Sequence, residues 1–520
     1  MKAPYKLLFN NDTTCTLTCV SPWHEEGEDF REDMLIASIE ELAGTGVDAY
    51  LLSPGMGWVP WWQSKVTADH YAWWKETTGL EPRRYDKYVY EGGDLVQVLV
   101  DTCKRLNISP FVSLRLNDVH LQEYYGRKDP RSHVCCRLYT EHPDWHLDPD
   151  HPQKEGYYGL RGMDWAHEEV RDYKLMLLEE LAEQYELAGL ELDFLRHSAY
   201  FRAEMPEAER IEIMTGFVGQ VRAAMDKHKP GDQRMYLSVR IPLDPARHAE
   251  LGIDVKRFHD VGVDMFNLSG WYNTLQVGGV AEVRAAVPDA AIYHEMTHSA
   301  NSHWFFLDSG QYGTNGNPRT TDHQFYTTAQ LAYERGADGV SLFNFVYYRM
   351  GHEMDIPVME PPFHVLPKLL DKDFLKRQQQ SYMLGGGPYC YQLPRDIAVG
   401  TTESFQFDMV PHDGPDRSTW STHAAFNDSP DASRLRLHAL EPIPEDAEIT
   451  VTFNGRALEP NDNVSRFFGN PFDLMISPNH SHRRAWTLPK EILRNGLNDV
   501  EITVNGDRNI KMVYLDAWVG

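Results

Sequence analysis

The most constraining feature of the sequence is an alternation between short β-type runs and longer helical patterns over residues 1–384. Several β-type runs follow a helix that ends in Gly-X-Asp or Gly-Ala-Asp, as in GVDAYLL, GVDMFNL and GADGVSLF. Repeated helix–strand units predict a parallel sheet. The expected strands are eight, at residues 5–10, 47–53, 110–117, 189–197, 235–242, 263–271, 290–296 and 338–346. Eight such units favour a closed (β/α)8 TIM barrel over an open sheet.

The pattern changes after residue 384, where helical periodicity ends and short alternating runs such as EITVTFNG and NDVEITVNG begin. Asn-Gly pairs in these runs are typical of hairpin turns. We therefore expect a barrel over residues 1–384 and a small all-β, jelly-roll-like sandwich over residues 385–520. Within the barrel, the loops after the second and third strands are long, at 54–93 and 118–165. Loops of this face carry the active sites of such barrels.

Composition excludes several classes of protein. The chain has 50 Lys and Arg against 77 Asp and Glu, a net charge of −27, which argues against nucleic acid as a partner. No apolar run is long enough for a membrane span, and the start lacks a signal-peptide pattern, so a cytoplasmic location is expected. The six cysteines show no disulfide or zinc-ribbon spacing. Phosphate-binding, dinucleotide-binding and G-x-S-x-G motifs are absent, and we expect no cofactor.

The fourth expected strand, GLELDFLRH, carries the strongest chemical signal. Glu191 and Asp193 are two residues apart, so they share one face of the strand. Carboxylates that point into a barrel are costly unless they are paired or take part in chemistry. Asp193 lies nearer the mouth and is the stronger catalytic candidate. Glu191 is expected as an orienting neighbour or as half of a buried ion pair with an arginine.

Glu295, at the end of AAIYHEM, supplies a second carboxyl group from the seventh strand. Carboxylates after strands four and seven, together with GLELDF, resemble barrel glycoside hydrolases of the clan-A and family-10-like groups. The resemblance covers residues 1–380, and its specific part is 189–197 and 290–296. It implies hydrolysis of a glycosidic bond in a poly- or oligosaccharide, with Asp193 and Glu295 as the carboxyl pair. Clan A usually has Asn-Glu where this chain has Leu192-Asp193, which leaves nucleophile and acid both open for Asp193.

Polar and aromatic side chains near the strand ends form the expected substrate-binding set. Its members are Arg115, Asn117, Asp118, His120, Arg196, His197, Arg240, Asn267, Trp271, Tyr272, His294, Asn344 and Trp58. Arg115, Arg196 and Arg240 could bind an anionic sugar, such as a uronic acid or a sulfated residue. Alternatively, they pair the carboxylates of Glu191 and Asp193. Clustered tryptophans such as Trp58 and Trp61 suit the faces of sugars, or else they pack an inserted loop onto the barrel.

Two other classes of function stay open. Residues His294 to His298 spell H-E-x-x-H, the signature of a zinc metallohydrolase, but that chemistry requires both histidines on one face of a helix. The motif falls where the barrel requires a strand, which disfavours zinc, and we expect no bound metal. A carbohydrate-binding barrel without catalysis would keep the arginines and aromatic residues. It would lack a correctly spaced carboxyl pair. The sequence indicates nothing about oligomeric state.

Overall fold

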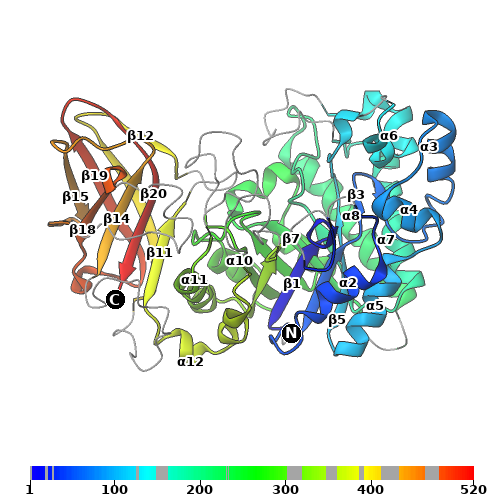
Figure 1. Ribbon diagram of the computed structural model, residues 1–520, viewed down its shortest axis with the longest axis horizontal. Coiled ribbons are helices and arrows are strands. Elements are labelled where there is room, and N and C mark those ends of the chain that lie inside the picture. The colour runs from blue at the N-terminus through cyan, green and yellow to red at the C-terminus, as the bar shows by residue number, and fades with distance from the viewer. Residues whose placement is uncertain are drawn as a thin grey trace. The chain divides into compact units, whose positions relative to one another are not determined.

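The fold is described from a computed structural model (Figure 1). It describes residues 3–17, 22–25, 28–124, 128–147, 162–229, 231, 234–300, 319–346, 360–385, 392–411, 433–462 and 480–520. The chain divides into two compact units, the first comprising Met1–Ser269 and Glu282–Tyr293, and the second Gly270–Ala281 and His294–Gly520. Part of the long loop after the third expected strand, residues 148–161, lies outside the described residues, as do Cys19 and Cys390.

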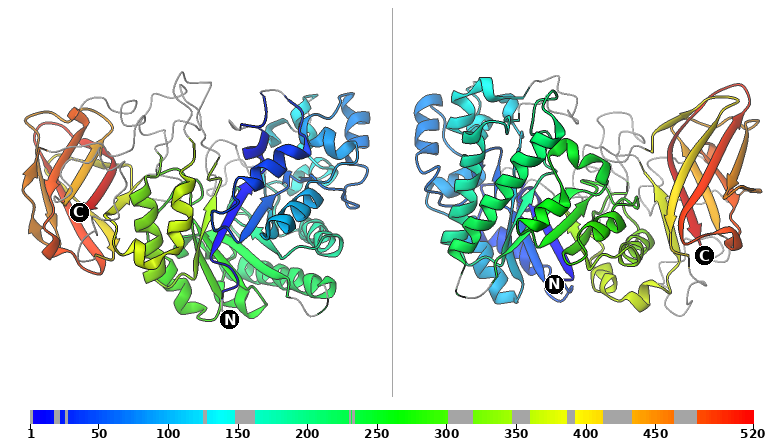
Figure 2. Two further views of the ribbon diagram at one scale, coloured as in Figure 1. Left: turned by 60° about the horizontal axis from the view of Figure 1, so that its bottom comes forward. Right: turned by 180° about the vertical axis from the view of Figure 1, so that it is seen from behind.

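A closed parallel barrel forms the larger part of the structure and confirms the predicted (β/α)8 fold (Figures 1 and 2). Its strands are β1 (Leu7–Asp12), β2 (Ala49–Ser53), β5 (Ser109–Arg115), β6 (Gly189–Asp193), β7 (Tyr236–Pro242), β8 (Met265–Ser269), β9 (Ala291–Met296) and β10 (Gly339–Phe343). Around the barrel they follow the order β1-β10-β9-β8-β7-β6-β5-β2. Each overlaps one of the expected strands. The two short strands β3 (Gly55–Met56) and β4 (Val59–Pro60) form a hairpin in the loop after β2.

Helices connect the barrel strands. They are α1 (Thr14–Leu17), α2 (Glu32–Glu40), α3 (His70–Thr78), α4 (Arg84–Tyr90), α5 (Leu95–Leu106), α6 (Arg137–Glu141), α7 (Glu168–Gln184), α8 (Glu207–His228), α9 (Val255–Asp260), α10 (Val280–Ala286), α11 (Asp322–Glu334) and α12 (Lys372–Leu375). In α5, Asp94 caps the start by accepting the N–H of Gln97, and Asn107 ends the helix in the left-handed region. None of the described helices combines the length and apolar character that a membrane span requires.

The recurring Gly-X-Asp sequence has a structural reason at the bottom of the barrel. The Asp48 carboxylate, just before β2, accepts the backbone N–H groups of Lys6 at 2.8 Å and Leu7 at 3.0 Å. Asp264, just before β8, accepts the N–H of Leu237 in β7 at 3.0 Å. Each aspartate therefore satisfies backbone donors at the start of the neighbouring strand, where the sheet leaves them without a partner. This contact fixes the register of adjacent strands.

Side chains alternate between the inside and the outside of the barrel along each strand. The bottom of the interior is apolar, with a core cluster that includes Phe111 from β5, Met265 from β8 and Tyr293 from β9. Glu295 shares the face of β9 that carries Tyr293, because the two residues are two positions apart in the strand. Its side chain therefore points inward, and it is 1% exposed. His294 points to the opposite face.

Above this apolar layer, Glu191 is fully buried and receives hydrogen bonds from four strands. Asn10 Nδ2 donates at 2.6 Å, Ser113 Oγ at 2.8 Å, Ser238 Oγ at 3.0 Å and Asn267 Nδ2 at 3.3 Å. These donors are uncharged, so the hydrogen bonds replace water around a buried charge. Glu191 thus joins β1, β5, β7 and β8 to β6 in the interior of the barrel.

The C-terminal part confirms the predicted β-sandwich, with two antiparallel sheets around one core (Figure 2). Its strands are β11 (Gln380–Leu384), β12 (Arg395–Ile397), β13 (Thr402–Met409), β14 (Arg434–Ala439), β15 (Glu448–Phe453), β16 (Arg456–Ala457), β17 (Pro460–Asn461), β18 (Arg483–Thr487), β19 (Gly496–Asn505) and β20 (Ile510–Val519). One sheet has the order β11-β20-β14-β18-β17 with β12 beside β20, and the other β13-β19-β15-β16. β11 precedes residue 385, the expected start of this module.

Helix α11, which belongs to the same compact unit as the sandwich, is joined to it by polar contacts. Arg335 at the end of α11 donates to the Asp408 carboxylate of β13 through Nε at 2.9 Å and Nη2 at 2.5 Å. Gln324 Nε2 donates to the hydroxyl of Tyr514 in β20 at 2.8 Å. A buried hydrogen bond and a bidentate ion pair of this kind fix one arrangement of helix and sheet.

We predict that Glu191→Gln lowers the free energy of unfolding by about 2–3 kcal/mol, because its amide N–H groups would face the side-chain amides of Asn10 and Asn267. Urea denaturation followed by circular dichroism measures this. Glu183→Gln, at an exposed position of α7, is the matched control and should change stability by less than about 0.5 kcal/mol. If Glu191→Gln leaves stability unchanged and only abolishes activity, the residue serves chemistry and the structural role is wrong.

Candidate active site

Charged side chains of alternating sign surround the mouth of the barrel in the first unit. Asp12 ends β1, Arg115 ends β5, Asp193 ends β6, and Arg240 lies on the inner face of β7. Arg115 Nη2 is 3.1 Å from Asp12 Oδ2, and Arg240 Nη1 is 3.1 Å from Asp193 Oδ1. Arg240 Nη2 also donates to Ser269 Oγ at 3.0 Å. All four charged residues are buried, so each charge depends on its neighbours for stabilisation.

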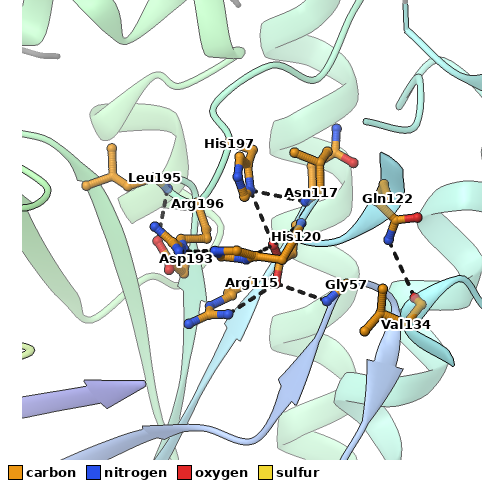
Figure 3. A network of polar contacts seen from close by, with 12 residues as sticks. Gly57, Arg115, Asn117, His120, Gln122, Val134, Asp193, Leu195, Arg196 and His197 are labelled. Atoms are coloured by element: carbon orange, nitrogen blue, oxygen red, sulfur yellow. Dashed lines mark hydrogen bonds and ion pairs between the residues drawn. The ribbon is translucent and has the colours of Figure 1, made fainter. Parts of the chain in front are cut away.

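Asp193, the predicted catalytic carboxylate, is held in one orientation. Besides Arg240, its Oδ1 accepts the backbone N–H of Leu195 at 2.9 Å (Figure 3). Both donors stabilise the negative charge of the carboxylate. The side chain is buried at the carboxyl end of β6, where barrel enzymes place their chemistry.

Asp118 lies at the centre of a polar network with Gly57, Arg115 and His120, and Figure 3 shows these three partners. Its fully buried carboxylate accepts from Arg115 Nη1 at 3.1 Å and from the backbone N–H of Gly57 at 3.0 Å. On its other oxygen it accepts from the backbone N–H of His120 at 3.0 Å and contacts Nδ1 of the same residue at 2.5 Å. Burial alone would raise the pKa of this carboxyl group, but its contacts with His120 and Arg115 hold the pKa well below its ordinary value.

His120 is held between a carboxylate and a guanidinium group. Its Nδ1 faces Asp118, and its Nε2 contacts Nη2 of Arg196. Because a guanidinium group only donates, Nε2 must accept, and the proton of the ring must lie on Nδ1. Burial, followed by the charge of Arg196, lowers the pKa of His120 to about 3. His120 is therefore neutral at neutral pH, with its Nε2 lone pair directed at Arg196.

His197, in the loop after β6, completes the cluster. Its Nδ1 accepts the backbone N–H of Val119 at 3.0 Å and lies 3.2 Å from Asp118 Oδ1. Burial lowers its pKa. The backbone of His197 has a φ angle of +58°, which lies in the left-handed region that residues other than glycine rarely adopt. Trp271 at φ +63° and Asn344 at φ +45° share this strain, and they follow β8 and β10. Such strain is concentrated at functional sites, and these residues all follow barrel strands.

The donor atoms of Asp118, His120 and His197 lie within 4.8 Å of one another, a spacing at which three ligands could hold a metal ion. Their hydrogen bonds do not fit such a role. Nε2 of His120 accepts from Arg196, and Nδ1 of His197 accepts from the Val119 N–H. Metal-bound histidine needs a free lone pair on one nitrogen and usually donates from the other to an acceptor. Two arginines against the cluster further oppose a cation.

Other predicted binding residues of the first unit have structural contacts. Asn117 Nδ2 donates to the carbonyl groups of Met163 at 2.9 Å and Ala199 at 2.6 Å, and its Oδ1 accepts the Met163 N–H at 2.9 Å. It therefore joins the loops after β5 and β6. Asn267 contributes to the hydrogen bonds around Glu191. Both side chains position other parts of the site.

Trp58 and its neighbours Trp61 and Trp62 are buried, at 1%, 3% and 1% exposure. The expectation of exposed sugar-stacking rings is therefore wrong for these three, and the packing alternative accounts for them. Lys174 of α7 places Nζ 4.1 Å from the Trp58 ring and donates to the Arg115 carbonyl at 3.1 Å. Burial lowers the pKa of Lys174 to about 8. A cavity of about 20 Å³, room for about one water molecule, adjoins Trp58 and Lys174.

The second unit contains the remaining predicted residues. Glu295 lies on the inner face of β9, and Asn344, directly after β10, is fully buried. Trp271 and Tyr272 are half-buried, and their ring centroids lie 4.7 Å apart. The ring centroid of Tyr272 lies 5.6 Å from that of Phe343. These two rings are thus the partly accessible aromatic residues in this predicted set.

The H-E-x-x-H motif lies on a strand and its extension, because β9 contains His294 and Glu295. Nε2 of His294 contacts the Leu275 carbonyl at 3.0 Å, so this nitrogen is the donor of that hydrogen bond. The helical geometry that the zinc chemistry needs is absent here. The metallohydrolase alternative therefore loses its structural basis.

Asp12 and Lys174 belong to the network but were not among the predicted residues. Asp12 lies two residues past the expected end of the first strand, in the run LLFNND. Alternation from Leu8 and Asn10 would have placed its side chain inside the barrel. Lys174 lies on a helix of mixed polarity, and its burial depends on tertiary packing that no local pattern reveals.

The sequence matches no protein-family model, and no curated protein matches it. Among solved structures, the chain is similar to alpha-L-fucosidase isoenzyme 2 from Paenibacillus thiaminolyticus, with a TM-score of 0.41 and 12% identity over 71% of this chain and 49% of that chain. The chain thus spans about half the length of that protein.

Two further similarities cover more of the other chain. A noncanonic maltogenic alpha-amylase from Thermotoga neapolitana gives a TM-score of 0.37 and 11% identity over 99% of each chain. The PgaB glycoside hydrolase domain from Bordetella bronchiseptica gives a TM-score of 0.39 and 10% identity over 66% of this chain and 95% of that chain. TM-scores below 0.5 transfer neither fold nor activity to this chain. The fold assignment rests on the strand topology instead.

We predict that the protein loses stability as the pH falls below 6.5. Burial lowers the pKa of His70 and His294 to about 4 and, with Arg196, that of His120 to about 3. The unfolded chain binds protons at these rings near the ordinary value of 6.5, whereas the folded chain does not. Each ring therefore costs about 1.4 kcal/mol of stability per pH unit between 6.5 and its folded pKa.

Urea denaturation across this pH interval measures the slope of stability against pH. His120→Gln should reduce the slope by the contribution of one proton, because the titrating ring is removed. An unchanged slope in this variant would contradict the neutral state of His120 in the folded chain.

Proposed function

We propose that this protein is a glycoside hydrolase that cleaves a glycosidic bond in an anionic poly- or oligosaccharide, with Asp193 and Glu295 as its carboxyl pair. The observation that carries the proposal is the position of these two groups. Each is buried, faces the interior of the barrel and stands at or next to the last residue of its strand. Barrel enzymes perform their chemistry at these strand ends, and glycoside hydrolysis needs two carboxyl groups.

The surroundings of Asp193 support a division of roles. Arg240 and the Leu195 N–H donate to the Asp193 carboxylate, an arrangement that suits a nucleophile or a base. We assign the role of proton donor to the leaving oxygen to Glu295 by elimination, as the second carboxyl group. Glu191 lies one layer below Asp193 and supports it through the strand rather than through substrate contact.

The three arginines contribute unequally to the proposed recognition of an anion. Arg240 pairs with Asp193, one of the two carboxylates in the pairing alternative, whereas Arg115 pairs with Asp12 and Asp118 instead. Arg196 donates to His120, whose side chain is the most exposed among Arg115, Asp118, His120 and His197. We therefore assign the proposed preference for an anionic sugar chiefly to Arg196.

The proposal is tested by hydrolysis of a panel of neutral, uronic and sulfated glycans. We expect sugar release from an anionic member, and a reduction of at least about 10³-fold in kcat for both Asp193→Asn and Glu295→Gln, as for other essential catalytic groups. Activity should survive a chelator. Asp226→Asn, at the surface of α8, is the control and should retain wild-type rates.

Two results would contradict the proposal. If activity survives both substitutions, the assigned carboxyl pair is wrong. If no glycan is cleaved while one still binds, the barrel is a carbohydrate-binding module, the second candidate that the arginines and the half-buried aromatic rings allow.

A further inference from the structure

A largely buried histidine–carboxylate pair joins the two long loops of the first unit. His133 lies in the short 3-10 helix Pro130–Val134 of the loop after β5, and Asp86 lies in α4, in the loop after β2. Nε2 of His133 is 2.9 Å from Oδ2 of Asp86, and the two side chains are 15% and 6% exposed. The pair is therefore a contact between loops that follow different strands of the barrel.

The hydrogen bonds of the His133 ring define its protonation state. Nδ1 contacts the Pro130 carbonyl at 2.7 Å, and a carbonyl oxygen only accepts, so Nδ1 carries a proton. Nε2 faces the Asp86 carboxylate, whose other oxygen accepts from Trp61 Nε1 at 3.1 Å and from the Tyr71 hydroxyl at 2.7 Å. Two further donors on a buried carboxylate favour its ionised form. Nε2 therefore donates as well, and the ring is an imidazolium ion.

The electrostatics of the pair agree with this geometry. Burial alone would lower the pKa of His133, but the charge of Asp86 and the hydrogen bond to it outweigh burial and raise the pKa above its ordinary value of 6.5. Burial alone would raise the pKa of Asp86, whereas the charge and hydrogen bond of His133 and the two other donors lower it. The pair is therefore ionised at pH 6.5, and a rise in pH removes the proton that joins the two loops.

The titratable groups around the ring, other than its carboxylate partner, keep their state near neutral pH. His70 of α3 donates from Nε2 to the His133 carbonyl at 2.7 Å, and burial lowers its pKa to about 4. Burial raises the pKa of Tyr71 well above its ordinary value. On the segment of His133 itself, Arg131 pairs with Asp129. Among these described groups, His133 is therefore the one that titrates between neutral and alkaline pH.

The pair adjoins the candidate site through the residue that follows His133. The Val134 carbonyl accepts the Trp58 N–H at 3.3 Å. Gly57 packs so closely on Val134 that a Cβ atom at position 57 would lie 2.7 Å from the same carbonyl oxygen (Figure 3). The Gly57 N–H in turn donates to the Asp118 carboxylate at 3.0 Å. The segment that His133 anchors to α4 therefore packs directly against the residue that donates to Asp118.

We propose that protonation of His133 latches the loop after β2 to the loop after β5, and that loss of this proton releases Gly57 from Asp118 and so opens the candidate site. His133 is a positioning residue, because it acts through the two loops. Deprotonation leaves the Nε2 lone pair facing the Asp86 carboxylate, which removes the hydrogen bond and sets two acceptors against each other. The latch operates whatever reaction the site performs.

The latch contributes stability on the acidic side of its titration. The unfolded ring titrates near 6.5 and the folded ring at a higher pH. The contribution of His133 is therefore complete below pH 6.5 and is lost as the pH rises through the folded pKa. His70 acts in the opposite direction and below 6.5, because burial lowers its pKa. The two histidines thus affect different ranges of pH.

The first test is the pKa of His133, measured by nuclear magnetic resonance of the full chain carrying ¹³C-labelled histidine rings. His133→Gln assigns the signal. We expect a pKa above 6.5 in the wild type and a lower pKa in Asp86→Asn, where burial acts without the opposing charge. Asp69→Asn is the matched control, because Asp69 also joins the two loops, through Arg137 at 3.1 Å, but is 69% exposed. An exposed ion pair contributes little, so the control should keep the wild-type pKa.

Hydrogen–deuterium exchange of the full chain shows whether the loops separate. The amides of Gly57 and Trp58 report the contact directly, because each donates to a group of the loop after β5. After correction for the intrinsic exchange rate, their protection in the wild type should fall by about tenfold or more between about pH 6 and about pH 9. In Asp86→Asn it should be low at both values, and Asp69→Asn should follow the wild type. The Leu237 amide, at the bottom of the barrel, should keep its protection throughout.

Three results would overturn the latch. The first is a pKa of His133 at or below 6.5 in the wild type, or one that Asp86→Asn leaves unchanged. The second is protection of the Gly57 and Trp58 amides that does not depend on pH in the wild type. The third is an equal loss of protection at Leu237, which would show that the pair only stabilises the whole fold. None of these measurements uses a glycan, so their outcome is separate from that of the hydrolysis panel.

Discussion

The buried carboxylate of Asp118 is the constraint on which the candidate site depends. It accepts hydrogen bonds from Gly57 in the loop after β2, from Arg115 at the end of β5, and from His120 in the loop after β5. A buried charge must be compensated by such contacts, so the segments that supply them are fixed relative to one another. Loss of this one charge would release the long loops that shape the mouth. It would also remove the group that sets the tautomer of His120.

The barrel interior is organised in layers of increasing polarity toward the mouth. Apolar residues such as Phe111 and Tyr293 form the bottom, and Glu191 with its uncharged donors forms the middle. The top layer holds charges of both signs, of which Asp193 and Arg240 form a direct ion pair. Stability therefore comes from the lower layers, whereas the upper layer keeps charges that a stable core would exclude. The strained backbone at His197 lies at this same end of the barrel.

Much of the barrel could be predicted from local sequence patterns, because the Gly-X-Asp sequence marks the boundary between helix and strand in several of its helix–strand repeats. The sequence also placed Arg115, Asp118, His120, Arg196 and His197 in one expected substrate-binding set, because they lie at or after the ends of neighbouring strands. The pairing of Arg115 with Asp12 could not be predicted, because it depends on the stagger between strands that closes the barrel. Nor could the burial of Trp58, whose position depends on the fold of a long loop over α7.

We propose that the mouth of this barrel binds sugars through their negative charge. Calorimetry with uronic-acid oligosaccharides and their carboxyl-reduced counterparts tests it most directly, because each pair differs only in charge. Asp193→Asn prevents turnover during the titration. We expect at least about tenfold tighter binding of a charged form, roughly 1.4 kcal/mol, and loss of this preference when Arg196→Gln is added. Equal affinities for both forms, or a preference that survives without Arg196, would contradict the account.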